Sequence, residues 1–150
     1  MKIDTNTSTF LETLLFCADN PDEENRPFED STIYDFTPEF ISAASTYLET
    51  LWERMTASPD IAAALDACER SFGGNAFFSG SGHGAGFFDE YPHDGDALQA
   101  SYDAISGRYR FEELETTIHL DLDTGKIDLA YLPEYVDERR AAIFTLPATV

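Results

Sequence analysis

Basic residues are scarce in this sequence, which has nine Lys and Arg against 29 Asp and Glu and a formal net charge of −20. Direct binding to nucleic acid needs clustered Lys and Arg opposite the phosphates, so the composition disfavours it. No apolar run approaches the roughly 20 residues of a membrane-spanning helix. The N-terminal MKIDTNTSTF lacks the charged and apolar regions of a secretory signal. We therefore expect a cytoplasmic protein without membrane contact.

Cysteine is also rare, since Cys17 and Cys68 are the two in the sequence. Their spacing matches no zinc pattern, and the sequence has no CxxC motif. Both lie in segments with a helical pattern, which predicts two small buried side chains in a reducing compartment. A Cys17–Cys68 disulfide is the alternative. No cofactor and no metal ion is expected.

Hydrophobic residues make up 43% of the 150 residues, which suits one domain over 1–150 with a substantial core. Capping residues and apolar spacing at i, i+3 and i+4 predict several helices. Glycines or prolines end most of them. The predicted helices run from the cap Thr9 to Asn20, over about 38–56 after Thr37-Pro38, from Ser58-Pro59 through Phe72 to Gly73-Gly74, over 98–105 after Asp94 or Asp96, and over about 133–143.

Strands are predicted where the apolar period changes from helical spacing to alternation. Residues 75–90 carry two Phe pairs around four glycines, which indicates a β-hairpin or a tight strand–loop–strand. Residues 114–120 and 127–131 alternate, with Asp123 to Lys126 as the turn between them. The order of elements favours an α+β fold, with helices packed on one face of an antiparallel sheet of about four strands. An acidic loop at about 18–35 and a loose tail from Leu146 complete the chain.

The negative charge is spread along the whole sequence. A compact chain of this length is roughly 38 Å across, and B-DNA of that length carries about 22 phosphates. The protein could thus imitate the field of a short duplex before a basic groove. Solubility alone and adaptation to high salt are the alternatives. The candidate partner-binding acids are the densest ones: Asp22, Glu23, Glu24, Glu29, Asp30, Asp89, Glu90, Asp94 and Asp96.

A glycine-rich segment, Gly80 to Gly86, has spacing similar to a dinucleotide-binding loop. It leads into Phe87-Phe88, which has a strand pattern, whereas such a loop must open a helix. We therefore expect glycines that permit a turn with positive φ. His83 in this turn is expected to hydrogen-bond to the backbone. The alternatives are a general base, or a metal ligand together with His93 and nearby carboxylates.

Residues 75–89, NAFFSGSGHGAGFFD, resemble the GHGAGFWD signature of small acidic proteins encoded by bacteriophages. Phe88 stands where those proteins usually have Trp. Upstream, Phe36-Thr37-Pro38-Glu39 is similar to their APET helix start, and the resemblance covers about residues 34–131. The family has no established activity, so no residue role transfers. The resemblance implies a mobile-element protein in the cytoplasm of a host cell.

Phage accessory proteins often block host defence, and the charge suggests how this one could act. The expected function is non-enzymatic, namely a DNA-mimic inhibitor of a host DNA-binding defence system, anti-restriction or anti-CRISPR. Its partner would be a host DNA-binding protein or nuclease complex. The alternative is an acidic protein–protein interaction module without nucleic-acid mimicry, which would use an exposed aromatic patch. An enzyme that uses His83 is a further alternative.

Overall fold

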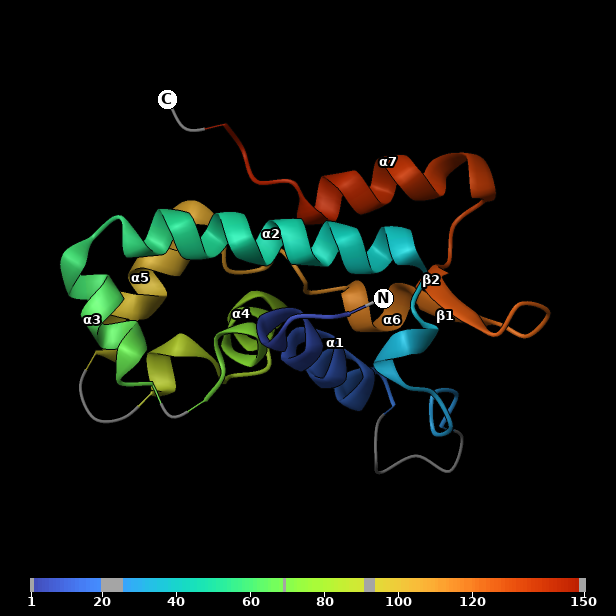
Figure 1. The fold of residues 1–150 in the computed structure, drawn as a ribbon, viewed down its shortest axis with the longest axis horizontal. Helices are drawn as coiled ribbons and strands as arrows, with labels where there is room; N and C mark the ends of the chain where they lie inside the picture. Colours follow the sequence, from blue (N-terminus) through green and yellow to red (C-terminus); the bar gives the residue numbers. More distant parts are fainter. Residues whose placement is uncertain (1, 20–25, 69, 91–93, 149–150) are drawn as a thin grey trace.

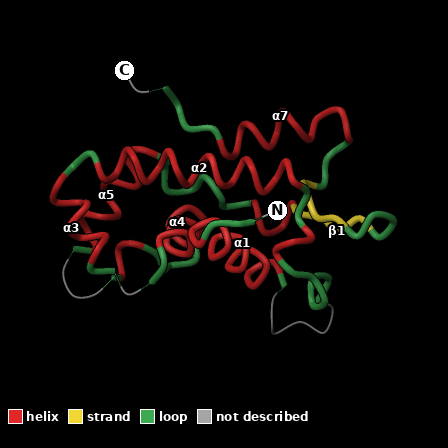
Figure 2. Tube along the Cα trace, viewed as in Figure 1, coloured by secondary structure: helices red, strands yellow, loops and turns green. Residues whose placement is uncertain are grey.

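Most of the chain is helical in the computed structural model, which describes residues 2–19, 26–68, 70–90 and 94–148 (Figures 1 and 2). Helix α2 runs along the long axis, with α7 along one side of it and α1 and α4 on the other (Figure 1). The elements are α1 (Thr5–Ala18), η1 (Ile33–Asp35), α2 (Pro38–Thr56), α3 (Pro59–Asp66), α4 (Phe72–Ser81), η2 (Phe87–Asp89), α5 (Gly95–Ile105), α6 (Leu114–Thr117), β1 (Ile118–Asp121), β2 (Lys126–Leu129) and α7 (Pro133–Phe144).

The long helix predicted at 38–56 is confirmed as α2. Its N-cap is Thr37, whose Oγ1 accepts a hydrogen bond from the Phe40 backbone N–H at 3.2 Å. Pro38 follows at the first helical position, where a missing N–H is harmless. Helices α5 and α7 also match their predictions, and Asp94 is the N-cap of α5. Local capping signals therefore located these three helices correctly.

The first helix begins earlier than predicted. Its N-cap is Asp4, which accepts from the Thr7 backbone N–H at 2.9 Å, whereas the predicted cap Thr9 lies one turn inside α1. The Thr9 hydroxyl donates back to the carbonyls of Thr5 and Asn6. Asp4 also accepts from Ser45 of α2 at 3.2 Å. An aspartate that both caps the helix and contacts a neighbouring helix outcompetes the internal Thr-x-x-Glu pattern.

The sheet is smaller than predicted. The described residues contain one two-stranded antiparallel sheet, with Ile118 opposite Leu129 and Asp121 opposite Lys126. Strand β1 begins at Ile118 because residues 114–117 form the single turn α6. One parallel bridge joins Phe36 to Ile127 and ties the hairpin to the start of α2. The fold is thus mostly helical with one small antiparallel sheet, and four strands are not present in these ranges.

The hairpin predicted at 75–90 is wrong, because residues 72–81 form helix α4. A Cβ added at Gly73 would lie 1.9 Å from the Asn6 carbonyl oxygen, and one at Gly80 would lie 2.4 Å from the Tyr102 hydroxyl oxygen. These glycines therefore permit close helix packing. The helix predicted to run through Phe72 ends at Asp66, and Ser71 caps α4 instead. Its hydroxyl accepts from the Gly74 backbone N–H at 3.2 Å.

The buried hydrophobic residues form one cluster with an aromatic centre. Phe10 of α1 makes edge-to-face contacts with Phe77, Phe111 and Phe144, at centroid distances of 5.6, 5.1 and 6.0 Å. Such pairs contribute about 0.5–1.5 kcal/mol each beyond the area they bury. The cluster joins α1, α4 and α7, elements that are distant in the sequence. It fixes the positions of the loops that follow α1 and α4.

The predicted acidic loop and the predicted loose tail are both attached to this body. Within the expected acidic loop, Phe28 is buried, and its backbone N–H donates to Asp19 at 3.2 Å. Residues 20–25 of that loop lie outside the described residues. At the other end, Leu146 is buried, and Arg54 donates to the Pro147 carbonyl at 2.6 Å. The tail is therefore anchored as far as Pro147.

Candidate functional site

The first cluster of candidate acids lies only partly within the described residues. Asp22, Glu23 and Glu24 fall outside them. Glu29 and Asp30 are exposed in the turn that follows Phe28. Their role in binding a partner stays a prediction.

The second cluster divides into acids that serve the fold and acids that face solvent. Asp89 forms a bidentate ion pair with Arg70, both bonds 2.8 Å long, and accepts from the Gly86 backbone N–H at 3.0 Å. The hydrogen bond from Arg70 lowers the pKa of Asp89. Glu90 is buried and accepts from the Asn75 side chain and the Arg70 backbone N–H. Glu90 is thus not the exposed acid that was expected.

Asp94 and Asp96 remain exposed at the start of α5. Asp96 lies beside a groove of about 510 Å³ whose walls include Phe78, Phe88 and Tyr109. A groove of this size with aromatic walls has the general character of a small-molecule or peptide site. Of the second cluster, these two acids are exposed and take part in none of the ion pairs among the described residues.

The seven arginines all contact their own chain. Arg26, Arg70, Arg108 and Arg140 pair with Asp side chains, and Arg139 packs over the Tyr131 ring. Arg54 and Arg110 donate to backbone carbonyls near the C-terminus. An Arg that is fixed in this way offers little free positive charge to a partner. The fold thus uses most of the positive charge of the sequence.

Exposed carboxylates, in contrast, lie on almost every element. Glu39, Glu49 and Glu53 share the outer face of α2 at helical spacing, and we name them the α2 stripe. The described ion pairs include none of the three. Other exposed acids on helices and on the hairpin include Glu12, Asp60, Asp66, Asp96, Asp121, Asp123, Glu134, Asp137 and Glu138.

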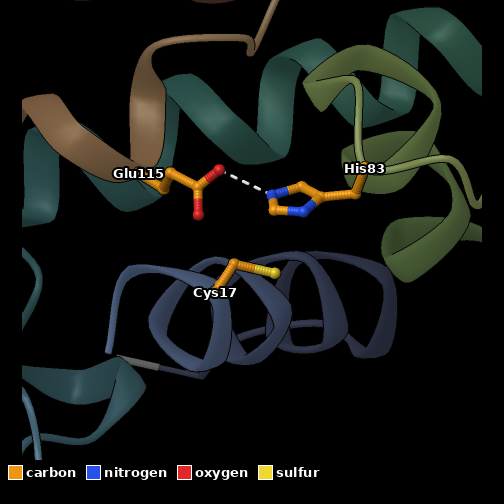
Figure 3. Close-up of side chains that lie close together, drawn as sticks. All are labelled: Cys17, His83 and Glu115. Carbon is orange, nitrogen blue, oxygen red and sulfur yellow. Dashed lines mark hydrogen bonds and ion pairs between the residues drawn. The ribbon is translucent and has the colours of Figure 1, made fainter. Parts of the chain in front are cut away.

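A different kind of site lies where α1, α6 and the loop after α4 meet. The Cys17 Sγ, a ring nitrogen of His83 and a carboxylate oxygen of Glu115 all lie within 4.8 Å of one another (Figure 3). Within this group, His83 Nε2 and Glu115 Oε1 are 2.6 Å apart and hydrogen-bonded. Sequence reasoning expected His83 to bond to the backbone, and this bond to a side chain corrects it. His93, its expected companion, lies outside the described residues.

Glycines place His83 at this point. Gly82 ends α4 with φ of 78°, and Gly84 has φ of 72°, conformations that L side chains rarely adopt. The loop is then closed by Ser79, whose hydroxyl accepts from the Phe87 backbone N–H at 2.9 Å. The GHGAGFF segment is therefore a helix end and a tight loop that present one imidazole toward α1 and α6.

The thiol of Cys17 is not activated in this arrangement. Burial, together with the negative charge of Glu115, raises its pKa to about 11. A cysteine nucleophile needs a lowered pKa, so the group lacks the thiolate of a cysteine hydrolase. Cys68 is also free, and burial with the charges of Glu90 and Asp94 raises its pKa to about 11. The predicted alternative of a Cys17–Cys68 disulfide is therefore wrong.

Sequence reasoning did not find the group of Cys17, His83 and Glu115. Its members lie on three separate elements and follow no known ligand spacing. His83 alone gave a signal, because it interrupts a glycine run. The other two positions follow only from the packing of α1 against α4 and α6.

Comparison of this chain with protein-family models, with curated proteins and with solved structures found no match. The resemblance to phage proteins therefore stays a prediction. Among the residues that the structure describes, no helix is both long enough and apolar enough to cross a membrane.

Proposed function

We propose that this chain is a non-enzymatic inhibitor that presents a DNA-like negative surface to a DNA-binding protein of a host cell, such as a restriction or CRISPR nuclease complex. The observation that carries this proposal is how the charges are distributed. All seven arginines are held against their own chain, while exposed carboxylates cover α2, α3, α5, α7 and the hairpin. A partner approaching from solvent therefore meets mainly negative charge.

The size of this charge is comparable with that of DNA. The net charge of −20 is close to the roughly 22 phosphates of a duplex as long as the protein is wide. Helix α2 alone, with 19 residues, is about 28 Å long at 1.5 Å per residue. Its stripe of three glutamates lies on this one helix, at positions 39, 49 and 53. A basic groove that accepts a duplex would attract such a surface and hold it in competition with DNA.

The test starts from protein captured on the immobilised chain from a host lysate at low salt. The captured protein is then eluted with a short DNA duplex, at a concentration that leaves the ionic strength unchanged. Elution under this condition means that the duplex competes with the chain for the same groove, because the screening of charges by salt has not changed. We expect the eluted partner to bind DNA when purified, and its DNA binding to be inhibited competitively by this chain. The proposal is wrong if the duplex elutes no DNA-binding protein, or if inhibition does not weaken as salt rises.

Matched variants locate the contact surface. The triple variant Glu39→Gln, Glu49→Gln and Glu53→Gln removes the α2 stripe. The control is a second triple variant, Glu12→Gln with Glu112→Gln and Glu113→Gln. It changes the net charge by the same amount as the stripe variant, at exposed positions outside α2. Inhibition should fall more for the stripe variant than for the control.

One observation favours the alternative of a protein–protein module. Tyr131, Leu132 and Tyr135 are 38%, 63% and 49% exposed around the start of α7. Exposed aromatic and aliphatic groups of this kind are typical of partner surfaces. In this case Leu132→Ser would abolish capture of the partner, while salt and duplex DNA would leave it intact. The two candidate functions thus predict opposite responses to the same elution.

A further inference from the structure

We propose that Cys17, His83 and Glu115 bind one Zn²⁺ ion, with water as the fourth ligand. The proposal is independent of the proposed function, since it concerns three residues outside the acidic surface. The group combines a sulfur, a nitrogen and an oxygen donor within 4.8 Å of one another (Figure 3). Each comes from a different element, namely α1, the loop after α4, and α6.

The donor set selects the metal. Zn²⁺ is bound in proteins by Cys, His and Asp or Glu, usually in a tetrahedron. Three protein ligands and one water make up the arrangement in which zinc keeps an open position. Mg²⁺ and Ca²⁺ prefer oxygen ligands, and this group offers one carboxylate only. A thiolate beside an imidazole therefore favours zinc over the hard cations.

The geometry requires only small movements. Zinc–ligand bonds of about 2.0–2.3 Å in a tetrahedron place the ligand atoms about 3.5 Å apart. The widest pair in the group must close by about 1.3 Å at most, since no pair exceeds 4.8 Å. The hydrogen-bonded pair of His83 and Glu115, now 2.6 Å apart, must open by less than this. Both changes are within the range of side-chain rotation.

The loop that carries His83 can follow such a change. A Cβ added at Gly82 or Gly84 would meet no atom within 4 Å, so open space surrounds the backbone on both sides of the histidine. The His83 and Glu115 side chains are 35% and 17% exposed, which leaves an opening for the ion and its water. Cys17, which supplies the sulfur, is half-buried. The site thus has an entry path and one sheltered ligand.

Binding has a defined chemical balance. The Cys17 thiol loses its proton to solvent as the Zn–S bond forms. The proton between His83 Nε2 and Glu115 Oε1 moves to the other ring nitrogen of His83, and the two freed atoms each form a bond to the metal. One proton is therefore released for each Zn²⁺ ion bound. No oxidant or reductant takes part. The ion then links α1 to α6 and to the end of α4, so binding stabilises the folded chain.

Cobalt is the probe for the test, because Co²⁺ replaces Zn²⁺ in such sites and reports its ligands. Untagged protein, kept reduced, is titrated with Co²⁺ and then with Zn²⁺. We expect one ion per chain, a near-ultraviolet thiolate-to-cobalt band, visible bands of tetrahedral cobalt, and loss of all of them when Zn²⁺ displaces the cobalt. A parallel thermal scan with Zn²⁺ should show a higher Tm.

Variants assign the ligands. Cys17→Ser is nearly isosteric and should abolish the thiolate band, and His83→Ala and Glu115→Gln should each weaken Zn²⁺ binding more than about 100-fold, beyond the loss typical of an outer-shell change. Cys68→Ala is the matched control, because its thiol is also half-buried with a pKa of about 11. Far-ultraviolet circular dichroism checks that each variant folds.

Three results would overturn the proposal. The first is a cobalt spectrum of wild-type protein without the thiolate band. The second is equal Zn²⁺ affinity in wild type and Cys17→Ser, which would place the metal on surface carboxylates. The third is loss of the band in Cys68→Ala but not in Cys17→Ser. None of these results bears on duplex-displaceable binding of a partner, so the two proposals fail separately.

Discussion

Gly73 gives the sharpest test of the packing between α1 and α4. A Cβ at this position would lie 1.9 Å from the carbonyl oxygen and 2.8 Å from the carbonyl carbon of Asn6, and 2.5 Å from the Thr9 hydroxyl. Real Cβ atoms almost never lie closer than 3.0 Å to such atoms, and ordinary contact begins at 3.4 Å, so Gly73→Ala requires the two helices to separate here by about 1.1–1.5 Å. Backbone atoms cannot rotate away as a side chain can. The substitution therefore destabilises the packing between α1 and α4.

The magnitude follows from what that interface carries. Phe10, Leu11 and Leu14 of α1 are fully buried, so moving α1 disturbs the centre of the core. Overpacking of a core typically costs about 1–3 kcal/mol, and we expect about 3 kcal/mol here because the clash is with backbone. For a domain of this size that lowers the Tm by about 6–12 °C. The gain in helix propensity, at most about 1 kcal/mol, offsets only part of this.

The neighbouring glycine provides the control. A Cβ at Gly74 would lie 3.1 Å from the Ser71 hydroxyl and 3.5 Å from the Thr13 hydroxyl, both at the ends of side chains. We expect Gly74→Ala to stay within about 1 kcal/mol of wild type. Thermal and urea unfolding, followed by circular dichroism, compare the two variants. Equal stabilities for Gly73→Ala and Gly74→Ala would refute the proposed close approach.

Three further predictions concern charges and thiols. Asp128→Ala should lower the free energy of unfolding in urea by about 3 kcal/mol, because it leaves the buried Arg140 without its main partner; an unchanged unfolding midpoint would contradict this. Asp89→Asn should destabilise the protein at neutral pH, because the pKa of Asp89 is lower in the folded chain than its unfolded value of about 3.9, and the resulting stabilisation is fully present above that value. The difference from wild type should shrink below about pH 4 and vanish only when the pH falls below the folded pKa; a difference independent of pH would exclude the Arg70 pair as its cause. The pKa of both thiols is about 11, so the rate of their alkylation should still rise with pH between about pH 9 and 10. Mass spectrometry measures this rate and compares it with that of an unstructured cysteine peptide.

The sequence predicted those elements whose signals are local. Thr37-Pro38 located α2, Asp94 located α5, and the turn before Lys126 located the hairpin, since caps and turns depend on neighbours within four residues. The start of α1 was missed because two capping patterns competed. Asp4 accepts from both the backbone N–H and the hydroxyl of Thr7, and Ser45 of α2 adds a further hydrogen bond that the local pattern does not show.

Glycine accounts for the largest error. Gly73 and Gly80 have the same composition signal as Gly82 and Gly84, yet the first two lie inside a helix and the last two have positive φ. A sequence shows that a glycine is present, but whether it serves a turn or a close contact depends on what packs against it. The aromatic pairs Phe77-Phe78 and Phe87-Phe88 beside these glycines resembled strands, so the segment was wrongly predicted as a hairpin.

The candidate site was predictable in composition and not in arrangement. The excess of acidic residues follows from counting them in the sequence. Asp94 and Asp96 were expected to be exposed, and they are. The use of Asp89 by Arg70 depends on residues 19 positions apart meeting in space. Cys17 and Glu115 are farther apart still, and only the aromatic core fixes their distance.

The charge of the surface and the stability of the fold are linked through the choice between arginine and lysine. Arginine presents a planar fork of donors that suits carboxylates and carbonyls, whereas lysine is a flexible point charge that usually stays in water. This chain has seven of the former and two of the latter, Lys2 and Lys126. Its arginines are therefore occupied by the fold, and the lysines that would neutralise the exposed acids are missing. A sequence that needed only solubility could add lysines to this surface without touching a single arginine contact, so solubility alone does not explain their scarcity, whereas the proposed function and adaptation to high salt both do.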